Sequence, residues 1–110
     1  MSRAIRRSAR VRRDLIEIYT YIHERSPGAA EKVLHSIEKN IRSLSDSPGI
    51  GHYWASSDPR FQGVRIAVVH PYRNYLIFFR LVEETVEVYR VVHGARELEP
   101  LMDDLDPELD

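Results

Sequence analysis

The sequence predicts an α+β domain: an N-terminal antiparallel helical hairpin packed on an antiparallel sheet of three to four strands, followed by a short C-terminal helix. Three observations predict it. Apolar residues recur at helical spacing in the first half, β-branched and aromatic runs fill the second half, and the connections within each half are short. A length of 110 residues with 43% hydrophobic content suits one core, so residues 1–110 are expected to form a single domain.

The first predicted helix begins at Ser8, a residue type favoured at helix N-caps. Its apolar residues are three or four positions apart and form one stripe for the core: Val11, Leu15, Ile18, Tyr19 and Ile22. Ser26-Pro27 begins a second helix, because proline at the first helical position loses no hydrogen bond. The second stripe consists of Ala30, Val33, Leu34, Ile37, Ile41 and Leu44. The connection over residues 24–27 is so short that the two helices must be antiparallel.

The second half begins with a glycine- and proline-rich loop over residues 47–63, which Trp54 and Phe61 are expected to hold against the core. Three strands are predicted at residues 64–69, 72–81 and 86–92, with connections short enough to make them antiparallel neighbours. Ile5 and Arg6 are a candidate extra strand, and residues 100–102 a candidate start of the terminal helix.

Both faces of the predicted sheet are apolar. Alternation in the third strand places Val86, Val88 and Val92 on one side and Tyr89 and Val91 on the other. The sheet therefore needs cover on both sides.

Several functional classes are excluded by the composition. The chain has no cysteine, so it has no disulfide and no thiolate metal site, and the five histidines never fall at the spacing of a zinc site. Glycine-rich phosphate loops and the common hydrolase motifs are absent. The arginine-rich N-terminus is not followed by the apolar run of a signal peptide, and no apolar run is long enough to span a membrane, so we expect neither feature. We expect a cytoplasmic protein with no cofactor and no metal.

The charges are divided unevenly along the chain despite a net charge of −1. Arginines crowd residues 3–13, and carboxylates crowd the tail at about residues 103–110, which need not be ordered. The asymmetry indicates an electrostatic partner, although two solvated ends would give the same pattern.

Arginine is the only basic residue type after Lys39 apart from histidine, and guanidinium groups lie all around the predicted sheet: Arg65, Arg73, Arg80, Arg90 and Arg96. The segment from Pro71 to Arg80 reads PYRNYLIFFR, and the segment from Val91 to Arg96 reads VVHGAR. Together with the helical hairpin, Pro48 and Gly51, these segments resemble, in their order, the ParE/RelE superfamily of toxins from type II toxin-antitoxin systems, closer to ParE. The resemblance covers about residues 3–102.

The resemblance implies a toxin that is not an enzyme and that poisons DNA gyrase by direct binding, with Arg73, Arg90, His93 and Arg96 as target-binding residues. Gly94 is expected to turn the chain with a positive φ, so that His93 and Arg96 project from the sheet. A plain structural role for His93 and Arg96 is the simpler alternative.

A second hypothesis is a RelE-like, metal-free endoribonuclease that cuts messenger RNA on the ribosome, in which Arg73, His93 and Arg96 would be catalytic. RelE-like members typically have lysines in the middle of the chain and an aromatic residue in the tail. In this sequence the loop and the second predicted strand hold no lysine, the tail has Leu101 and Met102, and added carboxylates repel phosphate. A third hypothesis is an inactive toxin fold kept as a binding module.

Under either toxin hypothesis the resemblance implies a hetero-oligomer with a cognate, ParD-like antitoxin, and no sequence-specific nucleic-acid binding. Expected antitoxin contacts are Leu76, Phe78, Arg80, Tyr89 and Val91 on the sheet, with Ile16 and Tyr21 on the shoulders of the first helix. The alternative is that the protein's own tail covers these residues.

Overall fold

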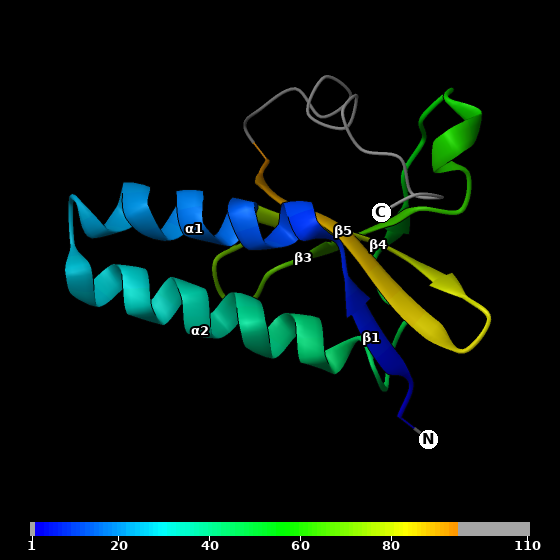
Figure 1. Cartoon of the computed structure of the whole chain (residues 1–110), viewed down its shortest axis with the longest axis horizontal. Helices are drawn as coiled ribbons and strands as arrows, with labels where there is room; N and C mark the ends of the chain where they lie inside the picture. The colour runs from blue at the N-terminus through cyan, green and yellow to red at the C-terminus, as the bar shows by residue number, and fades with distance from the viewer. Residues whose placement is uncertain (1, 95–110) are drawn as a thin grey trace.

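The computed structural model of the protein describes residues 2–94. Two helices lie against one face of a five-stranded sheet, which confirms the predicted α+β class (Figure 1). The elements in chain order are β1 (Ala4–Arg7), α1 (Ala9–His23), α2 (Pro27–Ser43), β2 (His52–Tyr53), the short 3-10 helix η1 (Pro59–Phe61), β3 (Arg65–Val68), β4 (Tyr75–Val82) and β5 (Thr85–His93). The predicted terminal helix and the acidic tail lie outside the described residues.

Helices α1 and α2 form the predicted antiparallel hairpin (Figure 1). The side chain of Ser26 accepts a hydrogen bond from the Ala29 N–H at 3.3 Å, and Pro27 occupies the first turn. Val11 and Ile37, one from each apolar stripe, are completely buried in the core. Helical periodicity in the sequence therefore identified the correct faces.

Ser8 occupies the predicted N-cap position of α1, but its side chain does not cap the helix. Its hydroxyl instead donates to the carbonyl oxygen of Tyr89 at 2.8 Å, and its backbone N–H donates to the carbonyl oxygen of Val88 at 2.9 Å. The start of α1 is thus attached to β5 where β1 ends.

The sheet has the order β1-β5-β4-β3-β2 and contains one strand more than the upper estimate of four. The extra pairing comes from β2, two residues that pair with β3 inside the predicted loop. Gly51 precedes β2 with φ of 82°, and a Cβ there would lie 2.2 Å from the Ile66 carbonyl oxygen. Glycine is therefore required for β2 to approach β3.

The expected extra strand at Ile5 and Arg6 exists as β1, but it pairs with β5 in parallel. The sheet is therefore mixed rather than wholly antiparallel. Parallel neighbours need a long crossover between them, and here the crossover contains the helical hairpin and the rest of the sheet.

Apolar clusters cover both faces of the sheet, as predicted. The first lies under the helices and includes Ile41, Ile77 and Phe79. The second lies on the opposite face and joins Phe61 of η1 to Phe78, with Trp54 packed against it. The Trp54 ring lies 5.2 Å from the Phe61 ring and 5.3 Å from the Phe78 ring, so the loop is held against the sheet as expected.

A β-bulge in β5 corrects the predicted alternation. Phe78 pairs with Arg90 while Phe79 pairs with Val88, so Tyr89 is an extra residue on β5. Beyond the bulge the faces are exchanged. Val91 belongs to the cluster under the helices and Val92 to the cluster on the other face, which is the reverse of the prediction.

Candidate functional site

The strand end marked by His93 lies beside the start of β4. Tyr75 and His93 are register partners whose rings meet edge to face at 5.3 Å, and the Gly94 N–H donates to the Asn74 carbonyl oxygen at 2.6 Å. Gly94 does not have the expected positive φ. A Cβ there would instead lie 3.3 Å from both the Asn74 oxygen and the Leu76 side chain, so close packing favours glycine at this position.

Next to this strand end, Asp14 of α1 and Arg90 of β5 form a buried ion pair. Two nitrogens of Arg90, Nε and Nη2, each donate to a different carboxylate oxygen of Asp14 at 2.8 Å, and both side chains are 2% exposed. The Val91 N–H also donates to Asp14, at 3.0 Å. The Nε of Arg10 lies 3.5 Å from the same carboxylate. Asp14 therefore balances the charge of Arg90 within the fold and accepts the backbone N–H of Val91, which lies beyond the end of β1 on this edge of β5.

A pocket of about 510 Å³ opens between the second half of α1 and this strand end, and we call it the sheet-end pocket. Glu17, Tyr21, Tyr75 and His93 line it, together with the Asp14–Arg90 pair. Burial and the nearby Tyr21 raise the pKa of the Tyr75 hydroxyl, which therefore stays protonated at neutral pH. On Tyr21 the guanidinium of Arg25 lies 3.9 Å from the ring centre.

The four expected target-binding residues have different environments. Arg73 is exposed in the turn before β4, and His93 is half-buried at the end of β5. Arg90 is 1% exposed and paired with Asp14, so in this fold it offers almost no surface to a target. Arg96 lies outside the described residues.

Three of the expected antitoxin contacts are also interior residues. Phe78 and Tyr89 lie in the second cluster beneath Phe61 and Trp54, and Val91 lies under the helices. Their exposed fractions are 0%, 1% and 1%. In this fold they offer almost no surface to a partner, because they belong to the two apolar clusters that cover the sheet.

The remaining expected contacts keep some exposure. Leu76 and Arg80 are half-buried, and Arg80 donates to the Gln62 carbonyl oxygen at 3.3 Å. Ile16 and Tyr21 are strongly exposed on α1, at 54% and 60%. Of the two predicted patches, the one on the first helix is thus the more accessible.

Below the Arg80 guanidinium, Tyr89 takes part in a polar network at the edge of the second cluster. Its hydroxyl donates to Glu87 at 2.8 Å, and Arg6 of β1 donates to the same carboxylate at 3.0 Å. Burial and the Glu87 carboxylate raise the pKa of Tyr89 well above its usual range. This tyrosine therefore has a structural role and is not poised for proton transfer.

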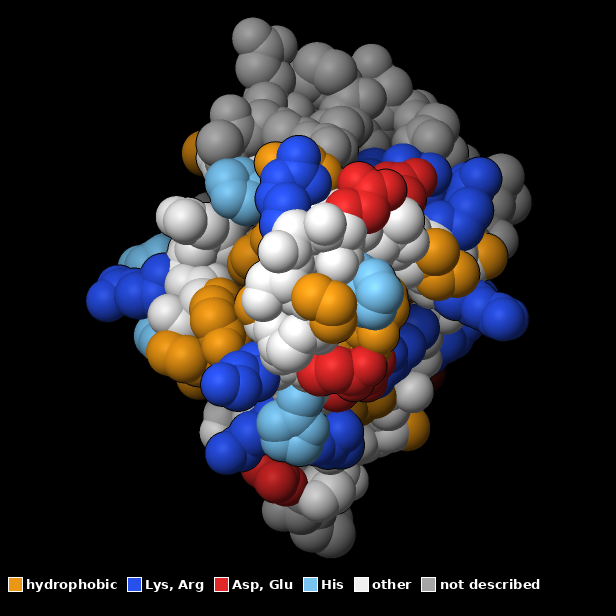
Figure 2. Space-filling model, turned by 90° about the vertical axis from the view of Figure 1, so that its left-hand side faces the viewer, with side chains coloured by type: hydrophobic (Ala, Val, Ile, Leu, Met, Phe, Trp, Pro, Cys, Tyr) orange, Lys and Arg blue, Asp and Glu red, His pale blue; other side chains and the backbone are white. Residues whose placement is uncertain are grey.

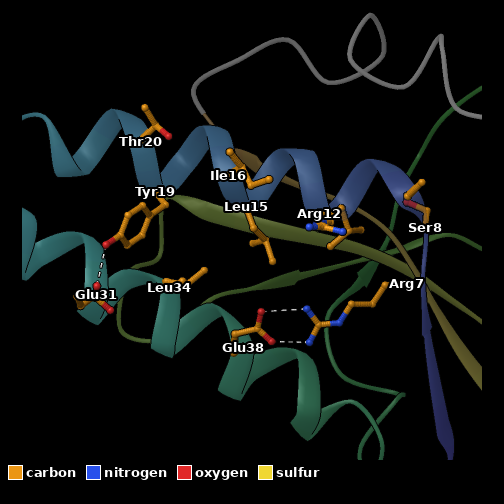
Figure 3. Close-up of a pocket in the computed structure, with 12 residues that line it drawn as sticks. Arg7, Ser8, Arg12, Leu15, Ile16, Tyr19, Thr20, Glu31, Leu34 and Glu38 are labelled. Carbon is orange, nitrogen blue, oxygen red and sulfur yellow. Dashed lines mark hydrogen bonds and ion pairs between the residues drawn. The ribbon is translucent and has the colours of Figure 1, made fainter.

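A second depression, which we call the interhelical groove, runs between α1 and α2 (Figure 3). Its volume is about 810 Å³. Apolar side chains of Leu15, Ile16 and Leu34 lie in its middle, and charged side chains lie towards its ends. The sequence predicted Ile16 as a contact residue on this surface, but it did not predict the groove itself.

Asp14 was not recognised as important from the sequence, although a signal was present. It lies three residues after Val11 and four before Ile18, inside the apolar stripe of the first helix. A carboxylate at a core position needs a buried cationic partner, and Arg90 in the predicted third strand offered one.

The surface at the closed end of the helical hairpin carries scattered arginine and lysine side chains with hydrophobic patches between them (Figure 2). Within residues 2–94, no group of three histidines or carboxylates is arranged to hold a metal ion. None of the described helices is long and apolar enough to cross a membrane.

The sequence profile of the ParE toxin of type II toxin-antitoxin system, parDE, matches residues 5–98. The chain belongs to the ParE toxin family. The match includes both helices, strands β2 to β5, all of β1 except Ala4, and the VVHGAR segment, so the resemblance inferred from ordered short motifs is confirmed. A comparison with curated proteins gave no match.

Two solved structures share the ParE/RelE fold with this ParE-family toxin. The chromosomal ParDE toxin-antitoxin system from P. aeruginosa aligns with a TM-score of 0.69 at 19% identity, over 84% of this chain and 96% of that one. The toxin-antitoxin complex RelBE2 from Mycobacterium tuberculosis aligns with a TM-score of 0.58 at 22% identity, over 84% and 99%. At these identities the likeness concerns the fold.

Proposed function

We propose that this ParE-family toxin acts in the cytoplasm by binding DNA gyrase and trapping its DNA-cleaved state, without chemistry of its own, and that a cognate antitoxin neutralises it. The observation that carries the choice of a protein target is the neutralisation of Arg90 by Asp14. Arg90, which precedes His93 on the same strand, is paired with Asp14 inside the fold. A second carboxylate, that of Glu17, lines the sheet-end pocket.

Electrostatics at the sheet-end pocket favours this proposal over RNA cleavage. An endoribonuclease needs cationic groups that stabilise the phosphate in the transition state. Arg90 contributes little net charge here, and the Glu17 carboxylate repels a phosphate backbone. Tyr75, with its raised pKa, and His93 remain as hydrogen-bonding groups suited to a protein surface.

The neighbours support an antitoxin as the partner of the complex. Both solved structures are described as toxin-antitoxin systems or complexes. On this chain Ile16 and Tyr21 expose apolar surface on one helix, and a buried interface with a second protein would cover it. The expected assembly is a hetero-oligomer of toxin and antitoxin.

The test compares two targets with the same purified protein. Gyrase with supercoiled plasmid is expected to accumulate cleaved DNA after protein denaturation, while translating ribosomes keep their message intact. Arg73→Glu should weaken the gyrase effect at least tenfold, because it reverses an exposed charge at the sheet end. Lys32→Glu makes the same charge change on exposed α2 and serves as the control. Cut message with unaffected gyrase would establish the ribonuclease instead.

A further inference from the structure

We infer that the sheet-end pocket receives an arginine side chain of the proposed target, DNA gyrase, held against tyrosine rings and paired with the carboxylate of Glu17. This inference rests on the proposed function and adds the chemical group that the pocket recognises. The pocket volume of about 510 Å³ is within the range of roughly 300–1,000 Å³ that small-ligand sites have, so one side chain fits.

Aromatic rings from three elements form the walls of the pocket. Tyr21 comes from α1, Tyr75 from β4 and His93 from β5. The Tyr75 and His93 rings meet edge to face at 5.3 Å, and the Tyr21 phenol is close enough to help raise the pKa of the Tyr75 hydroxyl. Faces of tyrosine rings attract cations, most strongly where water is excluded. The walls therefore favour a cationic ligand.

Glu17 supplies the negative charge at the rim of the pocket. It lies four residues before Tyr21 on α1, a spacing that places both side chains on the same face of the helix. Glu17 is exposed, and within residues 2–94 no hydrogen bond or ion pair involves its carboxylate. The other carboxylate of the pocket, that of Asp14, is already engaged by Arg90 and Arg10. Glu17 is thus the carboxylate that a ligand can pair with.

A guanidinium already lies on one of these rings within the toxin itself. Arg25 is 3.9 Å from the centre of the Tyr21 ring, and its Nη1 donates to the Tyr21 carbonyl oxygen at 2.8 Å. Arg25 is not among the residues that line the pocket, so it leaves that space open. A planar guanidinium can stack on a tyrosine and also donate to a carboxylate, whereas an ammonium is a more strongly hydrated point charge. The pocket therefore suits arginine better than lysine.

Other ligand classes fit the pocket less well. Arg90 donates through Nε and Nη2 to Asp14, and Glu17 repels an anion. An apolar side chain would cover the Glu17 carboxylate without giving it a partner. Residues 1–94 have a formal charge of about +5, so a broadly basic partner would be repelled at long range. The pocket thus suits a single arginine on a surface that is not basic overall.

The test uses blocked amino acids as probes of the full-length toxin. N-acetyl-arginine amide, its lysine counterpart and its neutral citrulline counterpart are titrated while the backbone amides of Val91, His93 and Gly94 are followed by NMR. We expect saturable shifts with the arginine probe, weaker binding of the lysine probe and no shift with citrulline. Glu17→Gln should weaken arginine binding roughly tenfold, because it removes the charged acceptor.

Two matched variants control for general effects of charge and of exposed rings. Glu24→Gln removes an exposed carboxylate just after the end of α1, outside the pocket, and should leave the affinity unchanged. Tyr21→Leu should abolish saturable binding, whereas Tyr53→Leu should retain it. The two rings are similarly exposed, at 60% and 66%, and each has an arginine over it, at 3.9 Å and 4.0 Å from the ring centre. Circular dichroism checks that each variant keeps the fold.

The same carboxylate variants connect the pocket to the target. In the assay with gyrase and supercoiled plasmid, Glu17→Gln should reduce the cleaved DNA several-fold at a fixed toxin concentration, and Glu24→Gln should not. If the arginine probe binds the pocket but Glu17→Gln acts on gyrase like wild type, the role of the pocket in target binding is overturned while the proposed function stands. If the probe binds but wild-type toxin leaves gyrase unaffected, it is the proposed function that fails.

The probes themselves can also overturn the inference. Equal shifts with citrulline would contradict a cationic ligand, and shifts with inorganic phosphate would contradict it and favour RNA cleavage as well. Arg96→Gln tests the toxin's own arginine as a competitor. If the arginine probe binds only in Arg96→Gln, the pocket serves Arg96 and not the target. If the probe causes no saturable shift in either protein, the pocket does not recognise arginine.

Discussion

Arg90 illustrates how one residue can carry a family pattern and still lie inside the molecule. Removing one partner of a buried ion pair typically costs about 3–5 kcal/mol, because the other charge stays buried. We therefore predict that Arg90→Met lowers the free energy of unfolding by roughly that amount in urea denaturation.

The matched control for this prediction is the double variant Asp14→Leu/Arg90→Met. It removes both charges, so most of the stability should return, but not all, since the Val91 N–H loses its acceptor and Arg10 loses its ion-pair partner. A single Arg90→Met variant as stable as wild type would contradict the buried pair. Loss of toxicity in Arg90→Met alone would not identify a target contact, because the fold is weakened as well.

The ion pair between Glu38 and Arg7 should make the free energy of unfolding depend on pH. The pKa of Glu38 is lowered in the folded protein, chiefly by the hydrogen bonds from Arg7. The stabilisation is therefore present above the ordinary carboxyl pKa of about 4.3 and is lost as the pH falls through the lower folded value. Glu38→Gln should cost roughly 1 kcal/mol at neutral pH and flatten the fall of stability below about pH 4.3.

The comparison variant is Glu84→Gln. The Glu84 side chain is 89% exposed, and its Oε2 lies 3.6 Å from the Nε of Arg3. This variant should leave the dependence of unfolding free energy on pH nearly unchanged. Identical curves for Glu38→Gln and wild type from pH 2.5 to 7 would mean that the Arg7 pair contributes nothing to stability.

At the scale of elements, the β4–β5 hairpin contains a residue in an unfavourable conformation. Glu83 follows β4 with φ of 56°, a left-handed backbone value that residues other than glycine and asparagine rarely adopt. Glu83→Gly should stabilise the protein by up to about 1 kcal/mol in thermal or urea unfolding. Glu84→Gly, at the neighbouring position with an ordinary φ, should instead destabilise it by about 0.5–1 kcal/mol. The opposite order would show that the turn conformation differs in solution.

The elements also show which features were predictable. The helices followed from apolar periodicity and the Ser26-Pro27 start, which are local signals. Strand β2 has two residues and no periodicity, and its pairing depends on Gly51 meeting Ile66 across the fold. The bulge at Tyr89 is likewise a tertiary feature, since alternation by itself assigns Val91 and Val92 to the wrong faces.

The same distinction applies to the candidate site. Ile16 and Tyr21 were predicted correctly as exposed, because they lie beside a helical stripe whose position is fixed by spacing. Phe78 and Tyr89 were expected on the surface because nothing local reveals that the loop with Trp54 folds over them. Sequence periodicity gives the faces of an element, while only the fold tells which face is covered.

At the scale of the whole molecule, the charge is divided unevenly between residues 1–94 and residues 95–110. Residues 1–94 contain fifteen of the sixteen lysines and arginines but ten of the seventeen carboxylates, so their formal charge is about +5 and that of residues 95–110 about −6. Long-range charge acts mainly on the association rate of partners. The acidic residues 95–110 would therefore oppose the electrostatic attraction of an acidic partner to the rest of the chain.

We predict that neutralising Asp103, Asp104 and Asp106 with asparagine raises the association rate constant of the antitoxin several-fold at about 0.05 M salt. The difference should vanish near 1 M salt, where the Debye length falls to about 3 Å. Stopped-flow mixing at both salt concentrations measures this. Asp46→Asn, which neutralises a carboxylate within residues 1–94, tests whether one charge anywhere gives a comparable gain. Rates that are equal at low salt would show that the acidic segment has no influence on encounter, and a gain that persists at high salt would point to a short-range contact instead.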